Sequence, residues 1–280
     1  MSVINTNISA TLASNALARN ERVMATAMER LSTGQRINSA KDDAAGMAIA
    51  ARMTGQVRGL EQAARNANDG ISMVQTVEGA SKEIMNMLVR MRELAVQAAS
   101  ETYSDTDRDA LDLEYQALEA EITRVATATQ WNGSNRMDLA AASDDFDVQI
   151  GANASQNMNV VFLSWDIADA AATAYGVDLS GDDLQSVANA TTAITNLDTA
   201  INGAAAEQAK YGSYISRLQH ASDNLMNVAQ NTDASRSRIA DADYAKETTE
   251  LARTQIIAQA GTAMLAQANQ VKQTVLALLQ

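Results

Sequence analysis

Apolar residues recur along most of this chain at alternating spacings of three and four residues. This period is typical of α-helices that pack along their length, as in coiled coils and helix bundles. It runs through residues 57–98, 111–129 and 187–225, so we predict helices throughout residues 57–129 and 184–235. At about 1.5 Å per residue, the helix over residues 57–98 alone would be about 60 Å long. The pattern therefore predicts a rod.

Both ends of the chain carry stripes of the same kind. The N-terminal stripe recurs every seven residues and consists of Val3, Ala10, Leu17, Met24 and Leu31. The C-terminal stripe consists of Ile257, Gly261, Met264, Ala268, Val271, Val275 and Leu278. A solvated helix normally has charges on its wet face, yet residues 1–18 have none and residues 254–280 have only Lys272. Disordered tails would be the alternative, but the regular spacing favours helices that are buried against neighbours.

One window departs from the helical period. Trp131-Asn132-Gly133 is a turn signal, because Asn-Gly is suited to positive φ angles. Apolar and polar residues then alternate, as in half-buried strands, with the apolar positions at Phe146, Val148, Ile150, Met158, Val160 and Phe162. We predict a small β-hairpin region over residues 131–165, followed by a connector over residues 166–183.

These patterns predict a mainly α fold, a long antiparallel helical rod or coiled coil with paired terminal helices and a small β-hairpin region. The chain goes out through helices, turns over in the hairpin region and returns, which brings the two termini together. We expect residues 1–45 and 236–280 to form a discontinuous terminal coiled-coil domain. Residues 46–130 and 166–235 then form a helical rod domain, and residues 131–165 are its hairpin region.

The composition excludes several classes of function. The 280 residues include no cysteine, no proline and one histidine, His220. Disulfides, thiolate nucleophiles and Cys-ligated metal sites are therefore excluded. The formal net charge of −13 argues against binding to nucleic acid or to an anionic membrane. No apolar run approaches the roughly 18 residues of a membrane span, and no secretory signal peptide is visible, so we expect no membrane insertion.

The charged motifs favour structural roles over chemistry. Residues 105–109 resemble the start of a calcium-binding EF-hand loop, but Ala110 stands where that loop needs glycine and Gln116 where it needs a bidentate glutamate. An acidic loop that begins a helix explains the segment, because carboxylates favour helix N-termini. The glutamates of residues 114–121 have no His or Lys constellation nearby in sequence and fit a solvated helix face. We expect no catalytic residue, no metal site and no cofactor.

Longer motifs resemble the signatures of bacterial flagellins. The N-terminal signature is matched by INTNISATLASN, LSTGQRINSAKDDAAGMAIA, NANDGISMVQTVEGA and MRELAVQAAS, at residues 4–15, 31–50, 66–80 and 91–100. The hairpin region is matched by QWNG and QIGAN, at residues 130–133 and 149–153, and the C-terminal signature by residues 237–270. The chain resembles a short flagellin that lacks the variable outer domains.

This resemblance implies a structural subunit, not an enzyme, that polymerises into the extracellular filament of the bacterial flagellum. It implies export in an unfolded state by the flagellar type III apparatus. The terminal domain would be the inner layer of the filament, with the terminal stripes making subunit contacts, and the rod domain would be the outer layer. Implied partners are further copies of the chain, the flagellar cap, hook-junction proteins and an export chaperone. A hook–filament junction protein shares the terminal design but lacks so full a set of signatures, and an enzyme would need a polar constellation that is not found.

The resemblance also implies a contact with an animal innate receptor, Toll-like receptor 5 (TLR5). The arginine, leucine and glutamate that form this contact in recognised flagellins match Arg90, Leu94 and Glu114. This chain departs from the usual pattern at Val89, where glutamine is common. It also ends in Gln280, where many flagellins end in arginine.

Overall fold

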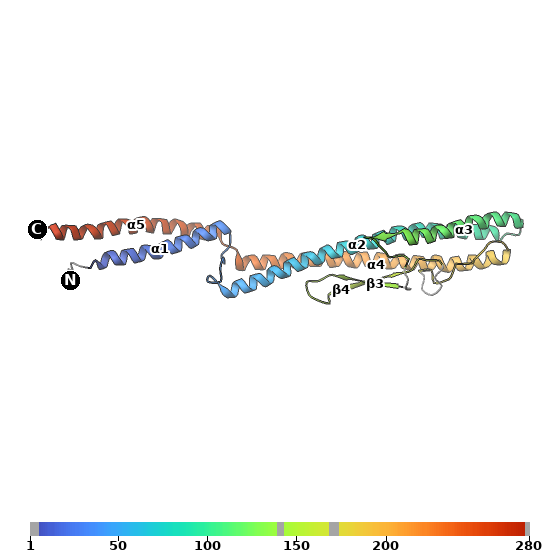
Figure 1. Ribbon diagram of the computed structural model, residues 1–280, viewed down its shortest axis with the longest axis horizontal. Coiled ribbons are helices and arrows are strands. Elements are labelled where there is room, and N and C mark those ends of the chain that lie inside the picture. The colour runs from blue at the N-terminus through green and yellow to red at the C-terminus, as the bar shows by residue number, and fades with distance from the viewer. Residues whose placement is uncertain (1–5, 139–142, 168–173, 278–280) are drawn as a thin grey trace. The chain divides into compact units, whose positions relative to one another are not determined.

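The computed structural model describes residues 6–138, 143–167 and 174–277, with side chains from 145 in the second range and up to 270 in the third. The chain divides into two compact units, a terminal unit of Met1–Val57 with Gln230–Gln280 and a middle unit of Arg58–Ala229. The described part contains five helices and four strands (Figure 1). In chain order they are α1 (Ile8–Thr33), α2 (Ala44–Ala98), α3 (Asp105–Ala128), β1 (Gln130–Trp131), β2 (Ser134–Asn135), β3 (Ser143–Gln149), β4 (Asn157–Leu163), α4 (Val187–Ala240) and α5 (Tyr244–Ala277).

In the terminal unit, α1 and α5 lie side by side, as Figure 1 shows. The α1 helix begins where the Asn7 side chain accepts a hydrogen bond from the Ala10 N–H, 3.1 Å away. It ends at Gly34, whose positive φ of 71° closes the last turn. The α5 helix begins after Asp243, whose carboxylate accepts from the N–H of Ala245 at 3.0 Å. The mainly α fold with paired terminal helices is confirmed.

Hydrogen bonds show that α1 and α5 run antiparallel. The Asn7 amide Nδ2 lies 3.2 Å from the carbonyl oxygen of Ala268, near the start of α1 and late in α5. At the other end of the pair, Arg30 Nη1 is 3.1 Å from Glu247 Oε1. Polar bonds therefore tie the pair together close to both of its ends.

The two connectors of the terminal unit, between α1 and α2 and between α4 and α5, are joined to each other. The Arg36 N–H donates to the carbonyl of Ala240 at 2.7 Å, and the Ala242 N–H donates to the carbonyl of Gly34 at 2.9 Å. These two bonds form an isolated antiparallel bridge. The Arg36 guanidinium also donates twice to the carbonyl of Ile239, at 3.1 and 2.6 Å. It thereby occupies a carbonyl that the end of α4 leaves without a helical partner.

The middle unit is built from helices that share one apolar core. Gln208 of α4 donates to the carbonyl of Ser81 on α2 at 3.2 Å, and Arg92 of α2 pairs with Asp198 of α4 at 2.5 Å, so these helices run antiparallel. Side chains from α2, α3 and α4 are fully buried between them, among them Leu88, Met91, Tyr115, Ile122, Leu197 and Leu218.

The prediction of continuous helix over residues 57–129 is wrong at residues 99–104. There α2 ends at Ala98 and α3 begins at Asp105. Ser104 and Asp107 form a reciprocal capping box that starts α3, in keeping with the expected acidic helix start. The buried Arg108 guanidinium then closes the turn by donating to the carbonyls of Ala98 at 3.1 Å and Ser100 at 3.4 Å. These bonds satisfy the carbonyls at the end of α2, which makes a helix–turn–helix more favourable than one long helix.

Two antiparallel hairpins follow α3. The pair β1–β2 turns through Asn132 and Gly133, which have φ angles of 48° and 77°, as a two-residue hairpin requires. In β4 the residues Met158, Val160 and Phe162 are buried and alternate with less buried ones. The predicted hairpin region and its register of inward positions are confirmed.

The connector between β4 and α4 packs against α4 through aromatic residues. The Trp165 indole N–H donates to the Tyr211 hydroxyl at 3.0 Å, and the Tyr175 hydroxyl donates to the Trp165 carbonyl at 3.0 Å. Gly203 makes this possible, because a Cβ there would lie 2.6 Å from the carbonyl oxygen of Ala174. Residues 174–183 contain no helix or strand, as expected for a connector, and residues 168–173 lie outside the described part.

Candidate assembly surface

The terminal unit exposes large apolar side chains on both of its helices. On α1, Ile8 is 62% exposed and Leu12 is 64% exposed. On α5, Ile256 and Met264 are each 66% exposed. Single exposed apolar residues are ordinary, but several of them on two paired helices are typical of helices that other subunits cover. We call Ile8, Leu12, Ile256, Ile257 and Met264 the terminal apolar surface.

This surface has almost no electrostatic component. Residues 6–18 and 254–270 contain no Asp, Glu, Lys or Arg, although most of them face solvent in the structure. Exposed helix faces normally carry charges, which keep a protein soluble and separate. Uncharged helix faces of this length are typical of helices that become covered by neighbouring subunits.

The C-terminal stripe lies differently from the prediction. On α5 the more buried positions, which form its side toward α1, are Glu247, Leu251, Thr254, Ala258, Gly261, Leu265 and Ala268. Gly261 and Ala268 belong to the predicted stripe, but Ile257 and Met264 lie to one side and are exposed. The rotation of α5 is fixed by the Arg30–Glu247 and Asn20–Thr254 bonds, and an apolar pattern ignores such polar positions.

The described part of the N-terminal stripe lies on the side of α1 toward α5, and its part in subunit contacts stays a prediction. Ala10, Leu17, Met24 and Leu31 are half-buried, and Ala13, Asn20 and Ala27 between them complete a spacing of three and four. Leu17 packs closely beside Gly261, because a Cβ at Gly261 would lie 3.5 Å from the Leu17 Cδ1. Val3 and Leu278 lie outside the described residues, as do the side chains of Val271 and Val275.

The three residues predicted to contact an innate receptor do not form one surface. Arg90 on α2 lies 2.9 Å from Glu114 on α3 and 3.0 Å from Glu93, and all three side chains are exposed. The hydrogen bonds that Arg90 donates to the Glu114 and Glu93 carboxylates raise the pKa of its guanidinium, so it stays charged. Leu94 is 1% exposed and belongs to the core of the middle unit. The apolar stripe of α2 already contains Leu94, so its burial follows from its position.

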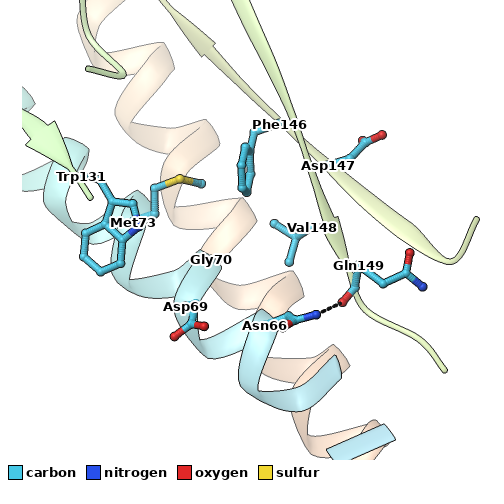
Figure 2. A pocket seen from close by; sticks show the side chains of 9 residues that line it. All are labelled: Asn66, Asp69, Gly70, Met73, Trp131, Phe146, Asp147, Val148 and Gln149. Carbon is cyan, nitrogen blue, oxygen red and sulfur yellow. Dashed lines mark hydrogen bonds between the residues drawn. The ribbon is translucent and has the colours of Figure 1, made fainter. Parts of the chain in front are cut away.

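A groove in the middle unit lies between α2 and the hairpins (Figure 2). Its volume is about 310 Å³, and Gly70, Met73, Trp131, Phe146 and Val148 form its apolar lining. The Asn66 amide closes one end by donating to the Gln149 carbonyl at 3.2 Å. Asp69 and Asp147 are its titratable residues, and neither has a basic partner or a nucleophile beside it in the lining. Such a lining offers shape but no evident acid–base chemistry.

Two further kinds of site are absent from the described residues. Nowhere in that part of the chain do three or more His, Asp or Glu side chains gather as they would to hold a metal ion. Among the helices described, none is long and apolar enough to cross a membrane.

Several functional contacts were missed at the sequence level. The Arg30–Glu247 pair, the Asn20–Thr254 bond and the Arg36 bonds to Ile239 all join residues more than 200 positions apart. Of these residues, only Asn20 could have been noticed in the sequence, because it is a polar residue at a position that fits the three-and-four spacing of the N-terminal stripe. Paired helices that expose apolar and uncharged residues over residues 8–18 and 254–270 define the class of the molecule: a helical coiled-coil protein suited to association with other subunits.

Comparison with known proteins makes the class specific. The sequence matches the bacterial flagellin N-terminal helical region over residues 4–141 and the bacterial flagellin C-terminal helical region over residues 194–279. A flagellin from Halalkalibacterium halodurans is 42% identical over 278 residues, which is 99% of this chain and 100% of that protein. The flagellar filament 31.3 kDa core protein of Treponema maltophilum is 40% identical over 290 residues, again 99% of this chain and 100% of the relative.

A solved flagellin structure from Bacillus cereus is also similar. It shares 34% identity with a TM-score of 0.49, and the match covers 61% of this chain and 94% of that one. This chain belongs to the bacterial flagellin family, and it is a structural subunit of the flagellar filament. The expectation from the sequence motifs is thereby confirmed.

Proposed function

We propose that the terminal apolar surface is where neighbouring subunits bind one another in the filament. The observation that supports this is the coincidence of exposure and missing charge over residues 6–18 and 254–270. Covering one large apolar side chain stabilises an interface by roughly 1.5–3 kcal/mol. The surface offers several such side chains per subunit, so its burial would supply much of the free energy of elongation.

Met264 is the most direct place to test this proposal. Its side chain is 66% exposed on α5 and lies off the contact with α1. Met264→Lys would remove most of its apolar burial and put an ammonium where no acidic partner lies nearby in sequence. Each elongation step would meet that cost, so the critical concentration should rise at about tenfold per 1.4 kcal/mol.

The measurement is sedimentation of seeded mixtures at a series of protein concentrations. Met264→Leu serves as the matched control, because it keeps an apolar side chain of similar volume and should pellet like the parent chain. Circular dichroism of the unassembled subunit should be unchanged in both variants. Normal pelleting of Met264→Lys would show that this surface does not contribute to assembly. Loss of helix in the monomer would show that Met264 stabilises the subunit instead.

We propose further that the terminal domain, residues 1–45 and 236–280, forms the inner layer of the filament, and that residues 46–130 and 166–235 with the hairpin region 131–165 form the outer layer. The division of the chain into two compact units supports a two-part subunit. The boundaries of these units in the sequence fall after Val57 and after Ala229, and so differ from the proposed ones. The family resemblance also supports unfolded export, an extracellular location and contacts with a cap, hook-junction proteins and an export chaperone. Proteolysis of assembled filaments would test the layers, because inner segments should be cleaved last.

A second proposed contact is with TLR5, through Arg90 and Glu114. Its support is the exposed ion pair of 2.9 Å that holds these two side chains together on α2 and α3. Leu94 is buried, so we do not expect its side chain to touch the receptor. We expect Arg90→Ala and Glu114→Ala to weaken the response of receptor-expressing reporter cells to the monomer.

The matched control for the receptor test is Glu121→Ala. Glu121 is exposed on the same helix as Glu114 and pairs with Arg124 at 2.6 Å. Equal activation by the parent chain and by both contact variants would remove the proposal. A parent chain that gives no activation would implicate the departure at Val89, which is 43% exposed beside Arg90.

A further inference from the structure

The turn of the β1–β2 hairpin is an asparagine followed by a glycine, and its surroundings hold neither residue. Asn132 and Gly133 are both exposed. Among the described residues, the Asn132 side chain has no hydrogen-bond partner, and the Gly133 backbone N–H has none either. A Cβ at Gly133 would meet no atom within 4 Å apart from its chain neighbours. The side-chain amide of Asn132 and the next backbone nitrogen are therefore both accessible and unconstrained.

A second Asn-Gly pair in the sequence, Asn202-Gly203, lies in a contrasting setting inside α4. Asn202 is exposed too, so exposure does not distinguish the two pairs. In a helix the N–H of each residue donates to the carbonyl four residues earlier, which engages the Gly203 nitrogen. The space around Gly203 is also filled, because a Cβ there would lie 2.6 Å from the Ala174 carbonyl oxygen and 2.7 Å from that of Tyr175. The two pairs share their covalent chemistry and differ in backbone conformation and packing.

The reaction open to an unconstrained Asn-Gly pair is loss of the side-chain amide. The Gly133 nitrogen, after losing its proton to water or hydroxide, attacks the side-chain carbonyl carbon of Asn132. A C–N bond forms, the bond to the amide nitrogen breaks, and ammonia leaves with a proton from the solvent. The product is a five-membered succinimide ring. Glycine favours this step because it has no Cβ to hinder the approach.

Water then opens the ring at one of its two carbonyl carbons. Opening at one carbon gives an ordinary aspartate, and opening at the other gives an isoaspartyl residue, in which the main chain runs through the former side chain. Both routes consume one water molecule, and neither needs an oxidant, a metal or an enzyme.

We propose that Asn132 is a site of spontaneous deamidation, and that its isoaspartyl product loosens the β1–β2 hairpin. The isoaspartyl linkage lengthens the main chain, whereas the two-residue loop sets the pairing of Trp131 with Ser134. Either product adds a carboxylate to a hollow that Asn132 lines together with Trp131 and Asp69, where another carboxylate already lies. The inference does not depend on filament assembly, because the hairpin lies wholly within the middle unit.

The loosening should stay local, because the second strand of the hairpin is anchored. The Asn135 amide donates to the carbonyls of Ala126 and Thr127 at 2.9 and 2.8 Å. Its side-chain oxygen accepts from the N–H of Met137 at 2.7 Å. These bonds join β2 to the end of α3 without passing through the turn. We therefore expect the change at the turn and in β1, with α3 unaffected.

The test uses the full chain, kept dilute and folded in water labelled with oxygen-18 at pH 8.5. Ring opening puts labelled oxygen into the product, so deamidation that preceded the experiment is not counted. Mass spectrometry of the peptides that contain Asn132 and Asn202 measures the labelled product at each site. We expect at least about tenfold more at Asn132, because freeing one hydrogen-bonded N–H in α4 costs about 1.4 kcal/mol, a factor of ten in rate.

The same chain unfolded in urea is the reference, since both pairs are then unconstrained and should react at similar rates. Equal labelling of the two sites in the folded chain would overturn the proposal. So would a folded chain that leaves Asn132 unlabelled while the unfolded chain is labelled there, because the turn would then protect it.

The effect on the hairpin needs a second measurement. The deamidated chain has an additional negative charge, so ion exchange separates it from the unmodified chain. Its hydrogen exchange over residues 130–135 should be faster than in the unmodified chain. Asn132→Asp is the matched control, because it supplies the charge on an ordinary backbone and should exchange like the parent. Unchanged exchange in the deamidated chain, or equally fast exchange in Asn132→Asp, would refute loosening by the isoaspartyl linkage.

Discussion

The side-chain amide of Asn20 donates a hydrogen bond to the backbone carbonyl of Thr254, with 2.6 Å between nitrogen and oxygen. Both residues are buried between α1 and α5, where most neighbours are small or apolar. Thr254 uses its own hydroxyl within α5, bonding the carbonyls of Glu250 and Leu251 at 2.9 Å each. A buried polar contact inside a helix pair is satisfied in one register only, so it selects that register at some cost in stability.

Replacing Asn20 should therefore change the register of the pair more than its helix content. In Asn20→Leu the buried polar constraint is lost, and only the Arg30–Glu247 and Asn7–Ala268 contacts then oppose a shift of α1 along α5 by one heptad. The chain has no cysteine, so Leu17→Cys with Gly261→Cys reports the native register through disulfide formation. Leu17→Cys with Ala268→Cys reports the shifted one. We expect Asn20→Leu to increase the second cross-link at the expense of the first, and an unchanged ratio would contradict the register role.

The terminal unit should open more readily than the middle unit. On α1 only Asn20 and Ala27 are buried, whereas α4 buries a residue at nearly every turn between Ala190 and Ala229. Few buried contacts mean a small free energy of local opening. Hydrogen exchange of the dilute monomer should show faster exchange over residues 8–33 than over residues 190–229. Equal protection in both ranges would mean that the α1–α5 pair is stable without neighbours.

Arg108→Ala should destabilise the middle unit by about 2–3 kcal/mol. The guanidinium is 6% exposed and binds the Ala98 and Ser100 carbonyls, and its loss leaves both without that donor. Urea unfolding followed by circular dichroism measures the effect. Arg124→Ala is the control, because Arg124 is exposed and pairs with the neighbouring Glu121 on the same helix, so its loss should cost less than about 1 kcal/mol. Equal effects of the two substitutions would refute a special role for the turn.

Tyr211→Phe should destabilise the connector by about 1–3 kcal/mol. It removes the acceptor of the Trp165 indole N–H while keeping the ring that packs 5.9 Å from Phe162. Trp131→Phe leaves Trp165 as the remaining tryptophan of the two in the sequence. In that background the emission of Trp165 should change, and the midpoint of the unfolding transition that it reports should fall. Tyr214→Phe, a half-buried tyrosine on the same helix, is expected to change neither. A midpoint that stays the same in Tyr211→Phe would show that the indole bond adds nothing net.

The strands and the return helix were predictable because their signals are local. Met158, Val160 and Phe162 alternate along a single strand, and Asn132-Gly133 suits the positive φ angles that a two-residue hairpin needs. The break at residues 99–104 was missed although Ser104 and Asp107 form a capping box that can be read from sequence. Apolar spacing continues on both sides of that break, and spacing alone does not distinguish one helix from two.

The contacts that orient α5 were not predictable in the same way. Glu247 and Thr254 are buried polar residues, and their partners Arg30 and Asn20 are more than 200 residues away in sequence. An apolar stripe through Ile257 and Met264 fits the helical period as well as one through Ala258 and Leu265. The choice between the two depends on bonds that exist only after the chain has folded back on itself.

The uncharged composition of residues 6–18 and 254–270 also determines how subunit contacts made by these residues respond to salt. Dissolved ions weaken contacts between charged side chains by screening them, and here there are none to screen. Sodium chloride should therefore leave these contacts nearly unchanged, whereas sulfate, which is excluded from protein surfaces, should strengthen them. A filament joined in this manner would hold in fresh water and in brine alike.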